Sequence, residues 1–160
     1  MIRTATATDV PAIHAMIREL AEYEKALHEA KATEEQLHDA LFGENPAVFG
    51  LIAEDDATGE SVGFALWFRN FSTWRGTHGI YLEDLYVRPD RRGGGHGKAL
   101  LTELARIAVE RGYSRVEWSV LDWNEPSINF YKSLGAVPMD EWTVHRLTDR
   151  ALAELGSQPR

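Results

Sequence analysis

The chain of 160 residues contains no cysteine. That absence excludes disulfide bonds, a thiolate nucleophile and zinc sites built on cysteine. No apolar run approaches the length of a membrane-spanning helix, about 20 residues, and no internal repeat or low-complexity segment is present. No secretory signal is expected either, because Arg3 is followed by small polar residues and an early helix. These features fit a cytoplasmic protein with no membrane partner.

Basic residues are also scarce. Lysine and arginine number 17 against 25 acidic residues, for a formal net charge of −8. This balance argues against nucleic acid as the main partner. It is compatible with a small cationic substrate, although a solvated acidic surface is the more ordinary explanation. The six histidines are scattered and none has the spacing of a metal ligand set, so we predict no metal.

Length and pattern predict a single α/β domain over residues 1–160, with a C-terminal tail from about residue 148. Apolar periodicity and turn signals define its elements. A turn-rich connector joins the strands expected at 48–54 and 61–69, which should therefore pair antiparallel. The full predicted order is a strand at 1–4, helices at 9–25 and 33–41, these two strands, a loop at 70–79, a strand at 80–87, a helix from 97, a strand at 115–121, a helix at 126–134, a strand at 142–147 and a short tail helix.

The stretch Tyr81–Leu104 combines a strand, a sharp turn, a glycine-rich loop and a helix. In the loop, Arg91–Lys98, few side chains keep an anion away from the backbone, and glycines allow close approach and positive φ. A phosphate at the start of a helix meets free N–H groups and the positive end of the helix dipole. We therefore predict a phosphate-bearing cofactor here; the alternative is a mobile, solvated loop. The spacing matches neither GxGxxG nor a P-loop, because alanine follows Lys98.

Two carboxylates, Glu83 and Asp84, lie inside the apolar strand that precedes this loop. Successive strand residues point to opposite faces, so a single salt bridge cannot satisfy both. Burying an unpaired carboxylate is costly, and perturbed carboxylates gather at functional sites. One interpretation is a catalytic or substrate-binding pair. The other is a set of structural ion pairs, for which Arg69, Arg88 and Arg115 are candidates.

A second motif, Trp123–Lys132, reads WNEPSINFYK and is followed by Gly135-Ala136. Together with the R-x-x-G-x-G loop at Arg92–Gly97 and the Tyr81–Asp84 segment, it resembles the GNAT acetyltransferases. The closest resemblance is to the diamine branch, which acetylates spermidine, spermine and thialysine, and it covers residues 2 to about 147. It implies a GNAT fold with a mixed, mostly antiparallel sheet flanked by helices, acetyl-CoA as cofactor and a homodimer.

The resemblance also implies a role for each motif. Tyr131 matches the family's acid, which protonates the departing thiolate, although an aromatic residue at helical spacing from other apolar residues is otherwise typical of a core. Glu83 would assist deprotonation of the amine, and Asp84 would hold a cationic substrate. The expected cofactor contacts are Leu85, Val87, Arg92, Gly93, Gly94, Gly95, His96, Gly97, Lys98, Asn124, Ser127, Tyr131 and Lys132. The expected substrate contacts are Glu83, Asp84, Trp74, Tyr23, Glu24, Glu141 and Trp142.

The implied activity is direct transfer of acetyl from acetyl-CoA to a primary amine of a small cationic metabolite, which is a polyamine, a diamine or a thialysine- or lysine-like amino acid. Two alternatives stay open. The first keeps the fold but acts on an antibiotic, an amino acid or a protein amine. The second is an acetyl-CoA-binding regulatory module without turnover. The presence of Tyr131 and both acids argues against the second, because such a module needs only the phosphate loop.

Overall fold

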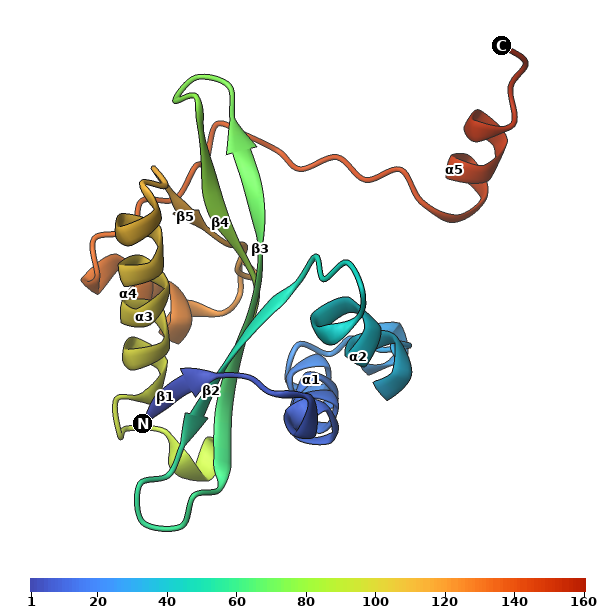
Figure 1. The fold of residues 1–160 in the computed structure, drawn as a ribbon. Helices are drawn as coiled ribbons and strands as arrows, with labels where there is room; N and C mark the ends of the chain where they lie inside the picture. The colour runs from blue at the N-terminus through green and yellow to red at the C-terminus, as the bar shows by residue number, and fades with distance from the viewer. The chain divides into compact units, whose positions relative to one another are not determined.

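The computed structural model describes residues 1–160, which form two compact units, residues 1–121 and 122–160. The first unit holds a five-stranded sheet in the order β1-β2-β3-β4-β5 (Figure 1). Neighbouring strands are antiparallel, except for β4 and β5, which are parallel. The mixed, mostly antiparallel sheet expected from the sequence is therefore confirmed. The strands are β1 Ile2–Thr4, β2 Phe49–Glu54, β3 Ser61–Ser72, β4 Thr77–Val87 and β5 Val116–Glu117.

Helices cover both faces of this sheet. Helices α1 and α2 lie on one face and α3 lies on the other (Figure 1). Because both faces are covered, the centres of β2 and β3 are continuous buried runs and do not alternate. The core under α1 is centred on the fully buried side chains of Ile13, Met16 and Phe64. The helices are α1 Val10–Tyr23, α2 Glu34–Phe42 and α3 His96–Arg111, with 3-10 turns at Ala7–Asp9, Leu27–Glu29 and Pro89–Arg91.

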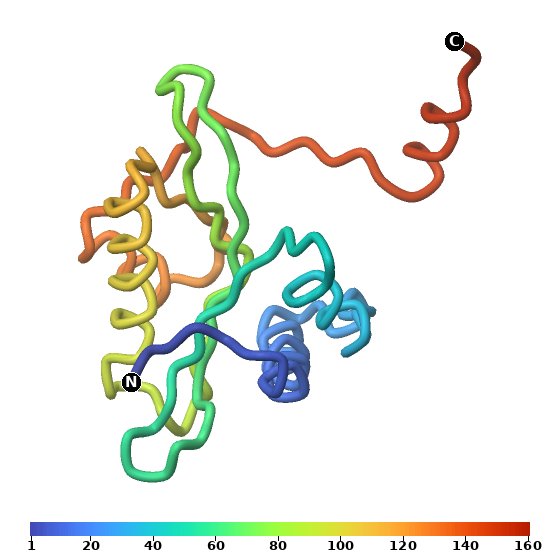
Figure 2. The backbone as a smooth tube through the Cα atoms, viewed as in Figure 1, coloured from blue at the N-terminus to red at the C-terminus, as the bar shows by residue number.

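Local signals set the ends of these helices. A capping box begins α2: the Gln36 backbone N–H donates to Thr33 Oγ1 at 3.1 Å, and the Thr33 N–H donates to the Gln36 side chain at 3.0 Å. Helix α3 ends at Gly112, whose φ of +71° suits glycine. The tube in Figure 2 shows the chain running from β4 through a turn and the glycine loop into α3. No helix is long and apolar enough to cross a membrane.

Part of the first unit differs from the prediction. Residues 70–79, expected as a loop, belong mostly to strands, because β3 continues to Ser72 and β4 begins at Thr77. The rings of Phe71 and His78 face each other across these strands, with centroids 5.2 Å apart. Periodicity missed this extension because the segment carries few apolar residues. The strand expected at 115–121 is reduced to the two residues of β5.

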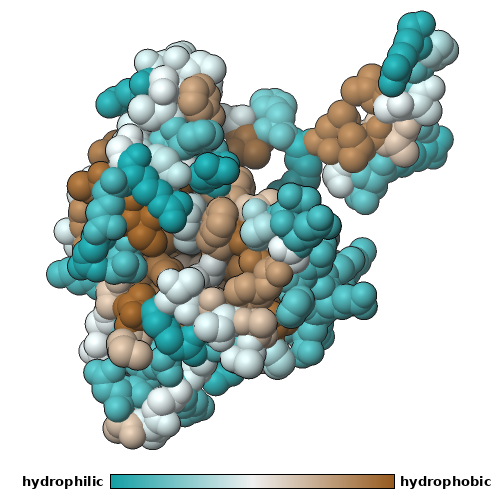
Figure 3. Space-filling view, viewed as in Figure 1, coloured by the Kyte–Doolittle hydropathy of each residue, from teal (hydrophilic) through white to brown (hydrophobic).

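The second unit, residues 122–160, contains the helices α4 Glu125–Ser133 and α5 Asp149–Gly156 and no strand. Helix α4 confirms the helix expected at 126–134. The strand expected at 142–147 is absent, because a strand needs a hydrogen-bonded neighbour and this unit offers none. Its apolar side chains are exposed, Trp142 by 66% and Val144 by 85%. Figure 3 shows further apolar surface on α5, where Leu152 and Leu155 are exposed.

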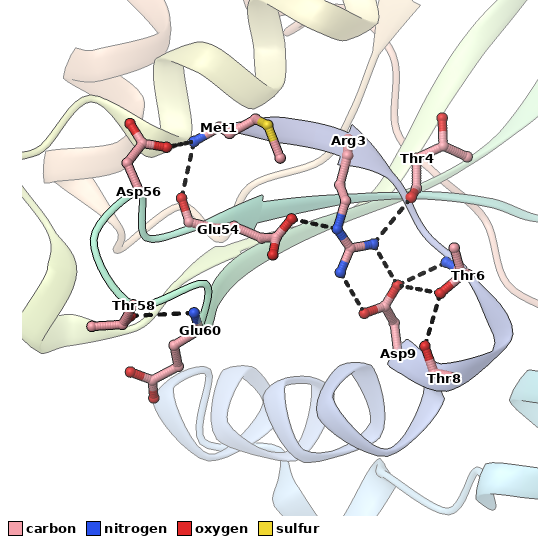
Figure 4. Close-up of polar contacts among 10 residues, drawn as sticks. All are labelled: Met1, Arg3, Thr4, Thr6, Thr8, Asp9, Glu54, Asp56, Thr58 and Glu60. Carbon is pink, nitrogen blue, oxygen red and sulfur yellow. Dashed lines mark hydrogen bonds and ion pairs between the residues drawn. The ribbon is translucent and has the colours of Figure 1, made fainter.

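A polar network fixes β1 between β2 and the start of α1 (Figure 4). Asp9 is buried and accepts hydrogen bonds from both terminal nitrogens of Arg3, at 2.7 and 2.8 Å, and from the Thr6 backbone N–H at 2.7 Å. The Nε of Arg3 also donates to Glu54 of β2. The hydrogen bonds from Arg3 hold the pKa of Asp9 below its usual range. One arginine thus joins three elements.

We expect Asp9→Asn to lower the free energy of unfolding by about 2–3 kcal/mol at pH 7, because the buried partner of Arg3 loses its charge. Since the folded-state pKa of Asp9 is lowered, its stabilisation is present above the unfolded-state pKa of about 3.9 and is lost as the pH falls below that value. Urea titrations should therefore show the difference at pH 7 and a smaller one at pH 3.

The matched control is Asp56→Asn, which also removes a carboxylate of the network in Figure 4. Asp56 pairs with the N-terminal amino group, but its side chain is 83% exposed. Exposed ion pairs contribute little to stability, so we expect Asp56→Asn to lower the free energy of unfolding by less than about 0.5 kcal/mol. Equal losses in the two variants would contradict the role assigned to Asp9.

Candidate active site

The two strands at the edge of the sheet, β4 and β5, separate after a short contact. Their parallel pairing is limited to Ile80 with Val116 and Tyr81 with Glu117. Beyond Tyr81, β4 continues to Val87 with β3 on one side and no strand on the other. The backbone N–H and C=O groups on that side have no strand partner and are available to a ligand, except the Val87 carbonyl, which accepts a hydrogen bond from Arg92. The predicted cofactor contacts Leu85 and Val87 both lie on this open segment.

The glycine-rich loop follows the open segment and leads into α3. Gly93 and Gly95 have φ values of +89° and +82°, in the region that favours glycine, and a β-carbon on either would meet no atom within 4 Å. The first intrahelical bond runs from the Ala99 N–H to the Gly95 carbonyl at 2.9 Å. The N–H groups of the first turn, from His96 onward, are thus left without helical partners. This is the geometry that binds phosphate at a helix start.

A shallow hollow of about 470 Å³ adjoins this loop on the side of α3 that faces β1. Gly95, Lys98 and Thr102 form part of its wall, together with Glu103 and Arg106. The hollow is open to solvent, and its wall carries both positively and negatively charged side chains. Neither Glu83 nor Asp84 lines it, so the glycine-rich loop borders two separate surfaces.

A β-bulge at Glu83 interrupts the regular alternation of β4. In the pairing of β3 with β4, Leu66 faces Asp84 while the next residue, Trp67, faces Leu82, so Glu83 is the extra residue. The expectation of strict alternation through this pair is therefore wrong. Leu82 shares a face with Trp67, on the α3 side, whereas Asp84 shares a face with Leu66, which belongs to the core under α1. The bulge thus turns Asp84 toward α1.

No arginine neutralises these two carboxylates. Arg88, one of the expected ion-pair partners, binds Glu19 at 3.4 Å and Glu60 at 3.6 Å. Neither the Glu83 side chain nor the Asp84 side chain forms a hydrogen bond or an ion pair in the structure. The structural ion pairs that the sequence left open are therefore not formed, and a cationic ligand has no protein cation to displace.

Burial and like charges shape the titration of this region. Burial raises the pKa of Asp84 to about 7, and the nearby carboxylates of Glu83 and Glu24 add to the rise. Burial also raises the pKa of Glu24, which directly follows α1. The three side chains do not converge as metal ligands do. Their separation and missing counter-charge instead suit an extended organic cation.

Aromatic residues connect the loop to α1. The Arg92 guanidinium carbon lies 5.5 Å from the Tyr23 ring centroid and 5.9 Å from the Tyr86 ring centroid. The Nε of Arg92 donates to the Val87 carbonyl at 3.0 Å, and the Tyr86 hydroxyl donates to Glu19 at 3.2 Å. The sequence alone does not single out Glu19 or Tyr86, because no motif marks them.

Trp74, a predicted substrate contact, lies in the turn that joins β3 to β4 and is 81% exposed. Seven residues of strand, about 23 Å, separate Thr77 at the start of β4 from Asp84. Within one chain, Trp74 therefore lies far from the carboxylates that the bulge brings together. Tyr23 and Glu24, in contrast, lie on the α1 face with Asp84.

The remaining predicted residues belong to the second unit. The Asn124 side chain caps α4, accepting a hydrogen bond from the Ser127 N–H at 3.4 Å. Tyr131 is half-buried, with its ring centroid 5.6 Å from that of Phe130, and Lys132 is exposed. Glu141 and Trp142 lie in the exposed segment between α4 and α5. Their roles stay predictions.

Comparison with known proteins gives consistent matches. The model of the acetyltransferase (GNAT) family matches residues 13–136. A thialysine N-epsilon-acetyltransferase of Mus musculus is 42% identical over 166 residues, with 98% of this chain and 97% of the relative covered. An L-ornithine N5-acetyltransferase of Arabidopsis thaliana is 35% identical, with 94% and 85% covered. Among solved structures, an integron cassette protein of V. cholerae is 26% identical, has a TM-score of 0.82 and is matched over 99% of this chain and 98% of its own.

The raised pKa of Asp84 leads to a prediction about stability and pH. The folded-state pKa of Asp84 exceeds the unfolded-state value of about 3.9. Its contribution to the free energy of unfolding is therefore most favourable below about pH 3.9 and is lost as the pH rises through 7. We expect the free energy of unfolding of Asp84→Asn to equal that of the wild type near pH 4. At pH 8 it should be higher than that of the wild type by roughly 1–3 kcal/mol. Urea titrations at both pH values measure this difference.

The control for this variant is Asp90→Asn, whose side chain is 78% exposed and close only to Arg91. We expect no pH-dependent gain there. A stability difference between Asp84→Asn and the wild type that stays the same at pH 4 and pH 8 would show that Asp84 titrates as an ordinary carboxyl.

Proposed function

The chain belongs to the acetyltransferase (GNAT) family, and from this premise we propose that it acetylates a primary amine of a small cationic metabolite of the thialysine, diamine or polyamine kind. The family match and the nearly full-length similarity to named N-acetyltransferases make it an N-acetyltransferase. The observation that carries the choice of substrate class is the group of three carboxylates, Glu24, Glu83 and Asp84, which have no bound protein cation.

Acetyl-CoA is the acetyl donor of GNAT enzymes. We assign its pyrophosphate to the backbone of the loop Arg92–Lys98 and its pantetheine arm to the open edge of β4 at Leu85–Val87. The positive φ values of Gly93 and Gly95 support the first assignment. The separation of β4 from β5 supports the second, because an extended arm with amide groups can pair with an unpaired strand edge.

In the proposed reaction the neutral amine nitrogen attacks the thioester carbonyl carbon, a C–N bond forms and the C–S bond breaks. Glu83 accepts the amine proton, directly or through a water molecule, and Tyr131 donates a proton to the departing thiolate. The exposure of Glu83 at the bulge supports its role, since its side chain can reach a water molecule or an incoming amine. A phenol and an alkyl thiol have comparable pKa values in water, which makes this proton transfer nearly balanced.

The named relatives support an amino acid or a related diamine as the substrate. They include thialysine N-epsilon-acetyltransferases at 41–42% identity and an L-ornithine N5-acetyltransferase at 35%. Both names describe acetylation of a side-chain amine on a compound that also carries a second cationic group. Asp84 and Glu24 would bind that group, while the attacking amine lies beside Glu83. We propose that this reaction takes place in the cytoplasm.

We also propose a homodimer. The second unit exposes Trp142, Val144, Leu152 and Leu155, and an association that covers these side chains would remove apolar surface from water. A second copy could also bring a distant residue such as Trp74 to the carboxylates. Sedimentation should give twice the chain mass of 18.0 kDa. A single 18.0 kDa species at all concentrations would rule out this assembly.

The proposed activity is tested by release of free thiol from acetyl-CoA with a panel of amines. The panel contains thialysine, lysine, ornithine, putrescine, spermidine, spermine, an aminoglycoside and a lysine peptide. We expect turnover on thialysine or another small diamine, because three separated carboxylates bind an extended, unbranched cation better than a neutral or bulky amine. Turnover on the aminoglycoside or the peptide alone would reject the substrate class but keep the enzyme.

In the same assay, Tyr131→Phe should lower kcat by at least about 100-fold, because the thiolate loses its proton donor. The matched control is Tyr113→Phe, which removes a tyrosine hydroxyl at the far end of α3 and should leave kcat unchanged within about twofold. Near wild-type turnover in Tyr131→Phe would remove Tyr131 from the role of acid.

A further inference from the structure

Arg92 is the first residue of the R-x-x-G-x-G loop, yet its side chain reaches away from the loop. Its guanidinium lies over the rings of Tyr23 and Tyr86, at 5.5 and 5.9 Å, and its Nε donates to the Val87 carbonyl at 3.0 Å. The planar group therefore contacts the end of α1 and the end of β4 at once. A lysine could supply charge to a phosphate equally well but could not form this planar contact.

The end of α1 is a strained turn. The Lys25 N–H donates to the Glu22 carbonyl at 3.0 Å and the Ala26 N–H donates to the Ala21 carbonyl at 2.8 Å, which is the Schellman pattern of a helix end. Glycine normally occupies the left-handed position of that pattern, but here Lys25 has a φ of +60°. Such strain persists where surrounding contacts impose it.

Tyr23, which contacts Arg92, and Glu24, one of the three carboxylates, are neighbours in this turn. Tyr23 is the last residue of α1, Glu24 follows it and Lys25 carries the strain. Glu24 lies close enough to Asp84 to influence its ionisation. A shift of the loop backbone at Arg92 would therefore be transmitted through Tyr23 to one of the three carboxylates.

We propose that Arg92 is a positioning residue that couples the cofactor loop to the turn Tyr23–Lys25, so that CoA binding orders this turn and with it the carboxylate of Glu24. The inference rests on the proposed function for the place where CoA binds. When the pyrophosphate fixes the backbone of Gly93–Gly97, Arg92 loses freedom and holds Tyr23 in place. The coupling is reciprocal, so an amine bound at Glu24 tightens the binding of CoA.

The test is hydrogen exchange of the backbone in the segment 20–30, measured with and without CoA. CoA is added at saturation for each variant, as determined by calorimetry. In the wild type we expect CoA to slow exchange in this segment by about fivefold or more, because the turn opens less often. In Arg92→Lys, which keeps the positive charge, CoA should slow exchange in this segment by less than about twofold.

The matched control is Arg111→Lys, because Arg111 makes the same kind of contact at the other end of α3. Its guanidinium carbon lies 5.5 Å from the Trp67 ring centroid and 6.0 Å from that of Tyr113. This variant should keep the wild-type protection ratio. A second variant, Tyr23→Leu, leaves Arg92 and the loop intact and should bind CoA while losing the protection, which covers the case in which Arg92→Lys does not fold.

Each outcome decides the proposal. Wild-type protection in both Arg92→Lys and Tyr23→Leu overturns the coupling, as does CoA binding to the wild type without protection of residues 20–30. Absence of CoA binding in calorimetry overturns the proposed function as well, and calorimetry detects that failure before any exchange is measured. Loss of protection in Arg92→Lys and Tyr23→Leu, with protection kept in Arg111→Lys, supports the coupling.

Discussion

At Glu83, two residues of β4 face a single residue of β3, and the candidate site depends on that irregularity. Without the bulge, Asp84 would share a face with Ile80 and Leu82, under α3. With it, Asp84 shares the face of Tyr86 and approaches the end of α1. Beyond Tyr81 the strand has lost its partner β5 as well. One strand therefore presents carboxylates on a face and free backbone groups along an edge.

The desolvation of Asp84 lowers the stability of the free protein, and interactions elsewhere in the fold offset this loss. A carboxyl with a pKa of about 7 is partly neutral at physiological pH, and each negative neighbour makes its ionisation harder. A bound cation would reverse this balance, so the arrangement that weakens the free protein would strengthen the proposed complex with an amine. The paired Asp9 shows the opposite case, in which hydrogen bonds from Arg3 outweigh the effect of burial, lower the pKa of the carboxyl and stabilise the fold.

Arg3 and Arg92 show how one type of side chain can make two different kinds of contact. Arg3 uses its terminal nitrogens on the buried Asp9, before α1, and its Nε on Glu54 of β2. Arg92 uses the face of its guanidinium on two aromatic rings and its Nε on a backbone carbonyl. The first contact is satisfied within the protein. The second lies between the glycine loop and the end of α1 that carries Glu24, and the proposed coupling rests on it.

The sequence alone determined the family, the class of sheet, the helix ends and the glycine loop, because capping boxes, turn residues and motifs act over a few neighbouring residues. The loop at Arg92–Lys98 and the box at Thr33–Gln36 are of this kind. Only the tertiary structure decided the bulge at Glu83, the separation of β4 from β5, the extended hairpin through Phe71 and His78, and the contacts of Arg92. Each depends on contacts between segments that are distant in the chain. The apolar periodicity of one strand does not indicate which residues of another strand it pairs with.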